Sequence, residues 1–366
     1  MSLTSQLGKV FESILRDSIV QYLEGNNLLN NSQHGFRRGR SCLTNLLIFL
    51  DKVTRMVDEG NDMDVIYLDF AKAFDKVPHR RLLVKLRNHG INGKLLGWIE
   101  AWLSDRRQRV RINGHVSNWR DVTSGVPQGS VLGPVLFLLF IDDIDAGLLS
   151  HILKFADDTK VFNTADHHQD LQSDLLTLVD WSKKWQMEFN VSKCKVLHVG
   201  ANNPKTQYLV DGHCLKSVQE EKDLGVVVSA DLKSSRNCHA AYCKANQVLG
   251  MMKRTITNKG QGILLPLYKS LVRPLVEYCT PAWSPHYKKD KNLIEKIQHR
   301  FTRLRPGMSE LAYSDRLDRL KLWTLEERRN RADLIELFKI QKGLSGIRAT
   351  DLFEPDLDGR TRGHSL

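Results

Sequence analysis

Two β-prone runs that end in aspartate most constrain the fold of this chain. Residues 65–68 (VIYL) form a short apolar run between Asp64 and Asp69, which is typical of a buried strand. Residues 152–162 predict a hairpin with Asp157 and Asp158 at its tip. Taken singly, such aspartates favour a structural role, because turns and helix starts are where aspartate gathers. Together they indicate an α+β protein whose sheet carries carboxylates at its strand ends.

A glycine-rich segment between these runs points to nucleotide chemistry. SGVPQGSVLGP, at residues 124–134, allows the backbone to approach a nucleotide closely, and Gln128 is placed to hydrogen-bond it. Carboxylates from separate strand ends hold two Mg²⁺ ions about 3.5–4 Å apart in enzymes that activate a hydroxyl and stabilise a leaving pyrophosphate. Mg²⁺ prefers a few carboxylates plus substrate phosphates. The combination therefore predicts a two-Mg²⁺ nucleotidyltransferase, with Mn²⁺ as a substitute metal.

The remaining pattern is mostly helical. Apolar spacing predicts helices over residues 7–29, 41–57, 79–90, 94–104 and 171–185, and a largely helical chain from residue 237. Residues 107–112 alternate in polarity, and Asn113-Gly114 predicts that they enter a hairpin. Short strands are expected over residues 195–199 and 226–229.

The net charge of +12 is concentrated in one part of the chain. Residues 236–342 contain 22 Lys and Arg against 10 Asp and Glu, whereas the residues on either side nearly balance. Such an excess indicates a surface for a polyanion, with nucleic acid as the first expectation, or a solvated basic helical face. We expect the arginines of residues 316–339 to lie in outward-facing rows.

Membrane and secretion signals are not found in the sequence. The longest apolar stretch, residues 131–141, is too short to span a bilayer, and the N-terminus has no signal-peptide pattern. The six cysteines lack CxxC spacing, and the group formed by Cys238, His239 and Cys243 falls short of the four ligands of structural zinc. We expect an intracellular protein of the nucleus or cytoplasm, neither secreted nor membrane-bound, without zinc. Its oligomeric state is left open.

Four segments, in order and spacing, resemble the successive motifs of LINE-type (non-LTR) reverse transcriptases, and the jockey-like elements most. They are QHGFRRGRS, YLDFAKAFDKVPH, SGVPQGSVLGP and FADDTK, and YKSLVRPLVEYC extends the likeness into the basic part. The resemblance covers residues 1 to about 347. It implies an RNA-directed DNA polymerase that adds dNTPs to a primer 3′-OH on an RNA template. It also implies a right-hand fold with fingers, an antiparallel palm sheet and a basic helical thumb.

Under this resemblance, residues 1–235 would form fingers and palm, 236–345 the thumb, and 346–366 a loose tail. The family pattern assigns metal binding to Asp69, Asp157, Asp158 and the carbonyl of Phe70, and proton donation to pyrophosphate to Lys193. It assigns substrate contacts to Phe74, Gln128, Gly129, Arg37 and Arg40, with Phe74 as the aromatic that blocks a ribose 2′-OH. Leu224 and Gly225 fall where the family grips the primer. Asp75 is expected to be structural, at the start of the helix after Pro78.

Two other hypotheses stay open at this point. An RNA-dependent RNA polymerase shares the paired aspartates, but Phe74 argues against it, because such an enzyme must admit the 2′-OH. The other is a truncated, inactive retroelement relic that only binds nucleic acid. The chain opens without the family's R-P-[IV]-S-L arginine, and neither an endonuclease nor an RNase H pattern is expected within it. The template RNA and the insertion target are not encoded in any motif.

Overall fold

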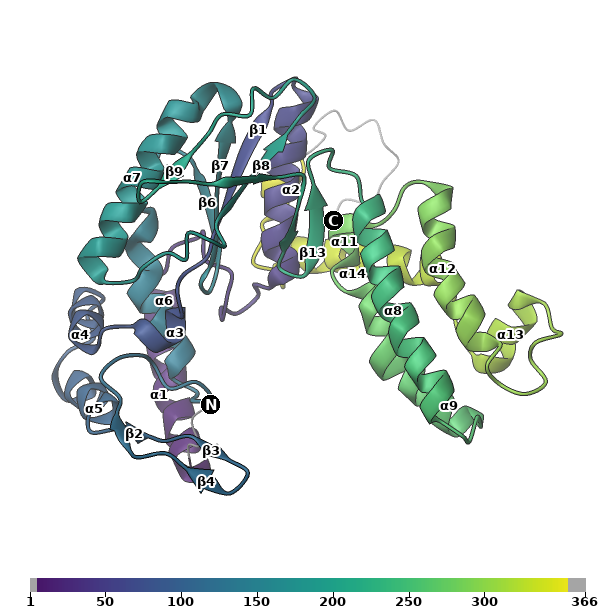
Figure 1. Ribbon diagram of the computed structural model, residues 1–366, viewed down its shortest axis with the longest axis horizontal. Coiled ribbons are helices and arrows are strands. Elements are labelled where there is room, and N and C mark those ends of the chain that lie inside the picture. Colours follow the sequence, from purple (N-terminus) through teal and green to yellow (C-terminus); the bar gives the residue numbers. More distant parts are fainter. Residues whose placement is uncertain (1–4, 355–366) are drawn as a thin grey trace. The chain divides into compact units, whose positions relative to one another are not determined.

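The computed structural model describes residues 5–354, which divide into two compact units (Figure 1). One unit contains the chain up to Arg37 together with Met56–Gln219. The other combines Arg38–Arg55 with the chain from Glu220 onward. The second unit therefore begins before residue 236 and takes in a helical segment from near the N-terminus. Each unit has its own apolar core.

The first unit is built on a five-stranded sheet with the order β11-β8-β1-β7-β6. All neighbours are antiparallel except β11 and β8. The central strand β1 is mostly buried, as its apolar sequence predicts. The strands are β1 (Met63–Leu68), β6 (His151–Phe155), β7 (Asp158–Thr164), β8 (Lys195–Val199) and β11 (Lys216–Val218). The small strands β9 (Leu209–Val210) and β10 (His213–Cys214) pair separately.

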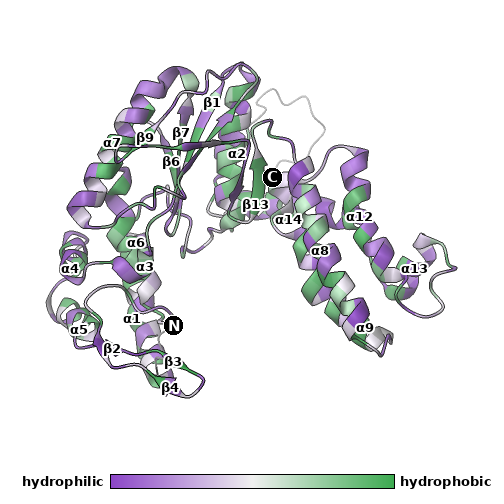
Figure 2. Cartoon of the chain, viewed as in Figure 1, coloured by the Kyte–Doolittle hydropathy of each residue, from purple (hydrophilic) through white to green (hydrophobic). Residues whose placement is uncertain are grey.

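The core of this unit joins the sheet to helices α6 (Gly133–Ile141) and α7 (His168–Trp185). Helix α6 is apolar on every side and almost entirely buried, so it forms the centre of the unit (Figure 2). Sheet residues Ile66, Val161 and Val196 share this core with α7 residues such as Leu175. The other helices are α1 (Gln6–Gly25), α3 (Ala73–Lys76), α4 (His79–Asn88), α5 (Gly93–Leu103), η1 (Asp142–Asp145) and η2 (Ala165–His167).

An exposed β-ribbon follows α5. Strand β2 (Arg107–Gln108) pairs with β5 (Arg120–Asp121), and β3 (Arg111–Ile112) pairs with β4 (His115–Val116). Asn113 and Gly114 close it with positive φ angles of 48° and 87°, which confirms the turn expected from this dipeptide. The alternating residues 107–112 form two short strands, β2 and β3, and between them Val110 exchanges hydrogen bonds with Ser117.

The second unit is helical apart from the hairpin of β12 (Glu220–Asp223) and β13 (Val226–Ser229). Its core includes Leu46 of α2 (Cys42–Asp58), Val226 of β13, and Tyr268 stacked on Phe301 at a ring-centroid distance of 3.9 Å. Residues Tyr268–Val272 form a π-helical turn, η3. The other helices are α8 (Ser235–Thr255), α9 (Gln261–Leu267), α10 (Arg273–Glu277), α11 (Thr280–Trp283), α12 (Lys288–Thr302), α13 (Tyr313–Leu320), α14 (Leu325–Gln341) and α15 (Ala349–Leu352).

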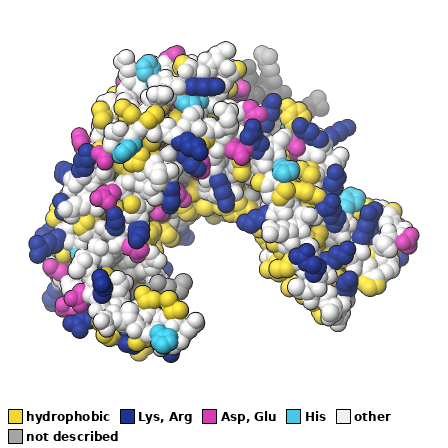
Figure 3. All heavy atoms as spheres, viewed as in Figure 1, with side chains coloured by type: hydrophobic (Ala, Val, Ile, Leu, Met, Phe, Trp, Pro, Cys, Tyr) yellow, Lys and Arg dark blue, Asp and Glu magenta, His cyan; other side chains and the backbone are white. Residues whose placement is uncertain are grey.

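The expectation that the arginines of residues 316–339 all face outward is wrong. Arg316 and Arg329 are each only 2% exposed. The Arg316 guanidinium donates to the His299 carbonyl at 3.1 Å and to Thr302 Oγ1 at 3.0 Å. It thereby supplies a donor to a carbonyl group in the last turn of α12, where intrahelical donors are lacking. Other cations of this unit do lie at the surface, where Lys and Arg side chains stand among apolar ones (Figure 3).

The C-terminal segment expected to be loose begins with local order. The Gly346 N–H donates to the Gly39 carbonyl at 2.6 Å, and α15 lies within this segment. Residues 355–366 fall outside the described part of the chain. Among residues 5–354, no helix combines the length and apolar character needed to cross a membrane.

A histidine–aspartate pair joins the end of α4 to η1. His89 Nε2 lies 3.6 Å from Asp142 Oδ2, and both side chains are largely buried. This contact raises the pKa of His89 above its ordinary 6.5, although burial opposes the rise. For Asp142, burial acts to raise the pKa, but hydrogen bonds with His89 and with the Asn30 N–H lower it overall.

We expect the free energy of unfolding to fall as the pH rises above about 6.5 through the pKa of His89. A raised folded-state pKa contributes stability that is complete below the unfolded value and lost above the folded one. Thermal melting between pH 6 and pH 9 should show this loss in the wild type and a flatter profile in His89→Gln. Parallel melting curves for the two proteins would contradict the coupling.

Candidate active site

Three charged residues lie at the same end of three neighbouring strands. Asp69 directly follows β1, Asp157 is in the turn between β6 and β7, and Lys193 precedes β8. Leu68 of β1 is opposite Thr159 of β7, and β8 pairs with the other side of β1. The sheet register therefore brings together residues that are far apart in the sequence.

The charges of Asp69, Asp157 and Lys193 influence one another. Burial raises the pKa of Asp157, the negative charge of Asp69 raises it further, and Lys193 acts in the opposite direction. Lys193 Nζ lies 3.3 Å from both carboxylate oxygens of Asp69. The two carboxylates and the single ammonium carry one net negative charge when all three groups are ionised. An added cation would balance it.

Phe70 and Asp158 flank the pair. Phe70 is buried and its ring stacks on Phe189 with centroids 4.6 Å apart. The backbone bonds that hold this stretch run from the Asn190 N–H to the Asp69 carbonyl and from the Ala71 N–H to the Glu188 carbonyl. They do not use the Phe70 carbonyl. Asp158 is the first residue of β7 and is exposed.

Phe74, five residues after Asp69, forms an aromatic stack with α6. Its ring lies on Phe137 of α6, with centroids 4.4 Å apart and an interplanar angle of 17°. The exposed ring of Phe36 meets it edge-on at 6.3 Å. Phe74 is only partly buried, so it is neither pure core nor free surface.

The glycine-rich loop lies along residues 74–78. The Gly125 N–H donates to the Val77 carbonyl and the Val126 N–H to the Phe74 carbonyl, both at 2.8 Å. Gly125 has φ +87°, and a Cβ there would be 2.6 Å from the Asp75 carbonyl oxygen. Only glycine suits this position without a shift of the backbone. Gln128 and Gly129 follow at the surface, before α6 begins.

Asp75 and Glu12 hold this loop from two sides. Gln128 Nε2 donates to Asp75 Oδ1 at 2.9 Å. The expectation that Asp75 starts the helix after Pro78 is wrong, because Pro78 itself occupies the cap of α4. Buried Glu12 of α1 accepts from the N–H of Val131 at 2.7 Å. Sequence spacing carried no signal for Glu12, since it lies in a different element, far along the chain.

Gln33 supports the turn that carries Asp157 and was not among the expected site residues. It is 1% exposed, and its Oε1 accepts from the Ala156 N–H at 2.9 Å and from the Gly35 N–H at 2.7 Å. Ala156 has φ +55°, an unfavourable value for alanine that the surrounding bonds stabilise. A Cβ on Gly35 would be 2.4 Å from the Ala156 nitrogen. The sequence signal for Gln33 is the Q-H-G that opens QHGFRRGRS. The family resemblance pointed only to the arginines of that segment.

Gln33→Ala should reduce single-nucleotide addition by about tenfold or more, because Asp157 loses the support of the preceding turn. Leaving buried N–H groups without a partner also costs about 1–3 kcal/mol of stability. Asn203→Ala is the matched control, since Asn203 is buried and bonds to the Met63 carbonyl at the start of β1. It should lower Tm comparably while activity below Tm is retained. Equal activity losses in the two variants would contradict a special role for Gln33.

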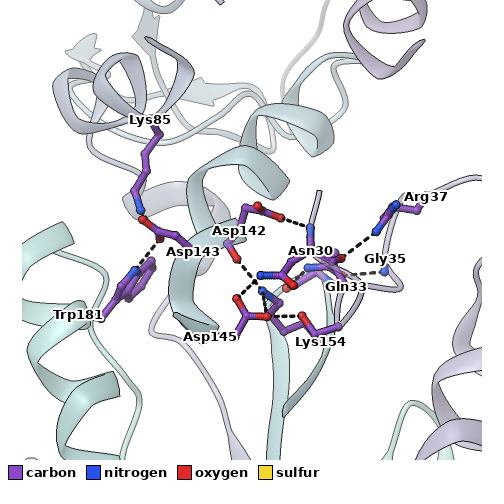
Figure 4. Close-up of polar contacts among 12 residues, drawn as sticks. Asn30, Gln33, Gly35, Arg37, Lys85, Asp142, Asp143, Asp145, Lys154 and Trp181 are labelled. Atoms are coloured by element: carbon purple, nitrogen blue, oxygen red, sulfur yellow. Dashed lines mark hydrogen bonds and ion pairs between the residues drawn. The ribbon is translucent and has the colours of Figure 1, made fainter. Parts of the chain in front are cut away.

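The same region is fixed by a network of polar contacts (Figure 4). Lys154 of β6 lies 3.2 Å from Asp145, and Asn30 donates to the same carboxylate at 2.7 Å. Asp143 accepts from Trp181 Nε1 at 2.8 Å and pairs with the buried ammonium of Lys85. The contacts of Asp145 tie Asn30 and β6 to η1, and those of Asp143 tie η1 to α4 and α7.

The remaining candidate residues are divided between the units. Arg37 is half-buried and donates to the Asn30 carbonyl at 2.8 Å, and burial lowers its pKa. Arg40 belongs to the second unit. Leu224 and Gly225 form the turn of the β12–β13 hairpin, also in the second unit, with φ angles of 46° and 91°. The Tyr278 hydroxyl donates to the Leu224 carbonyl at 3.0 Å.

The donor set around Asp69 suits a hard cation. Within residues 5–354 no group of three or more His, Cys, Asp or Glu side chains gathers in metal-binding geometry. The carboxylates of Asp69 and Asp157 would supply only part of an oxygen shell, and Mg²⁺ commonly completes such a shell with substrate phosphates and water.

A family model described as reverse transcriptase (RNA-dependent DNA polymerase) matches residues 1–234. The chain belongs to the reverse transcriptase family. The match covers the sheet, the carboxylates and the glycine-rich loop, and it ends just before α8. The α+β class is confirmed by the sheet and helices of the first unit.

Curated relatives confirm the resemblance to jockey-like reverse transcriptases. The chain is 26% identical over 352 residues to a probable RNA-directed DNA polymerase from transposon BS of Drosophila melanogaster, which spans 90% of this chain and 38% of that protein. It is 26% identical over 323 residues to the RNA-directed DNA polymerase from mobile element jockey of Drosophila funebris, with 82% and 35% covered. The chain thus spans little more than a third of these relatives.

A structural likeness extends to telomerase. The structure of apo telomerase from Candida tropicalis superposes with a TM-score of 0.47 at 11% identity, over 91% of this chain and 60% of that one.

Proposed function

We propose that this chain is the polymerase region of a non-LTR retrotransposon reverse transcriptase, adding dNTPs to a primer 3′-OH on an RNA template. The observation that carries the proposal is the meeting of Asp69, Asp157 and Lys193 at the ends of β1, β7 and β8. The first unit would supply fingers and palm, and the helical second unit the thumb.

Asp69, Asp157, Asp158 and the Phe70 carbonyl would hold two Mg²⁺ ions. When bound, such ions lower the pKa of an attacking hydroxyl and stabilise the leaving oxygen. The paired carboxylates are fixed to strand ends, so they need little reorganisation on binding. The fixed positions of Asp69 and Asp157 support their assignment as metal ligands more directly than that of Asp158, which is exposed.

The other residues of the site would position the substrate. Lys193 carries protons at Nζ beside Asp69, which suits a donor to the leaving pyrophosphate. Phe74, held by Phe137, would exclude a 2′-OH, and Gln128 with Gly129 would contact the incoming nucleotide. The Leu224-Gly225 turn would grip the primer. Arg37 and Arg40 would contribute positive charge from the fingers, with Arg37 also holding the loop at Asn30.

Primer extension on poly(rA)/oligo(dT) with Mg²⁺, beside filter binding of the same duplex, tests the proposal. Extension with dTTP would support it. Binding without extension would favour the alternative, a catalytically inactive retroelement relic that only binds nucleic acid. The basic surface of the second unit favours duplex binding under either function.

The exposed cations of the second unit should set the salt dependence of duplex binding. Neutralising Lys253 and Arg254, both exposed at the end of α8, should flatten the log–log salt slope by roughly 0.9 for each phosphate that the variant no longer neutralises. Neutralising Lys9 and Arg16 of α1 is the matched control and should leave the slope unchanged. Substitutions are preferable to a deletion from residue 237, because Leu46 and Val226 pack in the same core as those helices. If the slope stays unchanged in the Lys253/Arg254 variant as well as in the control, these α8 side chains are only solvated and do not contact phosphates.

A further inference from the structure

We propose that Asp75 is a positioning residue that fixes the orientation of the Gln128 side chain for the incoming nucleotide. The inference rests on the proposed function, since it concerns the nucleotide contact of the same site. It assigns a role to an exposed carboxylate that is neither a metal ligand nor a helix cap.

Asp75 lies within α3, and it caps neither α3 nor the following helix α4. The cap position of α3 is Lys72, and the cap position of α4 is Pro78. Within residues 5–354 the hydrogen-bond partner of the Asp75 carboxylate is Gln128 Nε2, at 2.9 Å. A charged acceptor makes this bond stronger than one between neutral groups.

The backbone presents these two side chains to each other. Ser124 Oγ donates to the Asp75 carbonyl at 2.9 Å, while Gly125 and Val126 bond to the Val77 and Phe74 carbonyls. The loop is therefore already anchored on both sides of Asp75. The carboxylate does not have to order the loop, and its bond restricts only the otherwise flexible side chain of Gln128.

The chemistry of this bond determines which end of the Gln128 amide is left for a ligand. An ionised carboxylate only accepts hydrogen bonds, so the amide nitrogen must face Asp75. The carbonyl oxygen Oε1 then remains as an acceptor on an exposed side chain. It suits a hydroxyl or amino donor of a nucleotide. Without Asp75 the amide would rotate and flip freely, and part of its population would present a donor instead.

Asp75→Ala tests this through steady-state incorporation of a complementary dNTP. The backbone bonds of residue 75 do not need the side chain, so the fold should be retained. We expect KM for the dNTP to rise about three- to tenfold, with a smaller change in kcat, because one neutral hydrogen bond between Gln128 and the nucleotide corresponds to roughly that ratio. The matched control is Asp17→Ala, which removes an exposed, ion-paired carboxylate from α1 and should leave KM unchanged. An unchanged KM in Asp75→Ala would overturn the proposal.

A reciprocal exchange separates orientation from a merely structural contact. Gln128→Glu alone places two carboxylates against each other and should weaken dNTP use more than Asp75→Ala. Adding Asp75→Asn restores a hydrogen bond with the donor and acceptor exchanged, at unchanged net charge. The carboxylate introduced at position 128 would keep a free acceptor oxygen. The double variant should regain at least threefold in kcat/KM over Gln128→Glu, and failure to regain it would contradict the orienting role.

A readout that does not require turnover distinguishes this inference from the proposed function. The side-chain amide resonance of Gln128, identified by its loss in Gln128→Ala, should shift in Asp75→Ala and not in Asp17→Ala. If the wild-type chain extends no primer under any condition, the proposed function fails, while this resonance still decides whether Asp75 orients Gln128. An unmoved resonance would overturn the inference even in an active enzyme.

Discussion

Asp157→Asn and Asp69→Asn should each reduce nucleotide incorporation by about a thousandfold or more. A metal pair supplies several kcal/mol of transition-state stabilisation, and each 1.36 kcal/mol is tenfold in rate. Both side chains lie at strand ends fixed by the register of β1 with β7, so the amide would occupy the same place with a weaker ligand oxygen. The measurement is single-nucleotide addition with Mg²⁺ at saturating dNTP.

Duplex binding provides the control for these variants. Removing a negative charge near phosphates cannot weaken their attraction, so filter binding should be unchanged or slightly tighter. Asp17→Asn, on the surface of α1, should leave both activity and binding unaltered. Incorporation within tenfold of wild type in either Asp69→Asn or Asp157→Asn would show that these carboxylates do not hold the catalytic metals.

Phe74→Val should let ribonucleotides enter, mainly through a KM for rNTPs that falls about tenfold or more. The aromatic ring contacts Phe137 and Phe36. In the proposed role it would be a rigid wall, and discrimination by shape collapses when such a wall shrinks. Use of dNTPs should change much less. Loss of the stack should also lower stability by about 1–3 kcal/mol.

Phe11→Val is the matched control for Phe74. Phe11 is partly exposed on α1 and meets Trp98 edge-on at 5.2 Å, so its truncation also removes an aromatic contact in the same unit. It should lower Tm without changing the ratio of rNTP to dNTP use. If Phe74→Val keeps the wild-type ratio, Phe74 is packing for α6 and not a sugar gate.

Short-range patterns determined a good part of this protein from the sequence alone. The apolar run before Asp69 forms the central strand β1, and Asn113-Gly114 forms the turn of the β-ribbon after α5. The helix predicted over residues 171–185 lies within α7. These features depend on side-chain periodicity and backbone preference over a few residues. The family motifs around Asp69 and Asp157 could likewise be recognised from the sequence, and the family match over residues 1–234 includes both.

Contacts between distant segments were decided only by the tertiary structure. Gln33 supports Ala156, Glu12 bonds to Val131, and Asp75 meets Gln128, yet none of these pairs has a local pattern that predicts it. The helical periodicity predicts that Arg316 faces solvent. It is buried instead, because the His299 carbonyl and Thr302 Oγ1 at the end of α12 accept hydrogen bonds from it. A hydrogen-bond partner is chosen by position in space. Sequence periodicity specifies which face of an element is apolar, but not which polar group will meet it there.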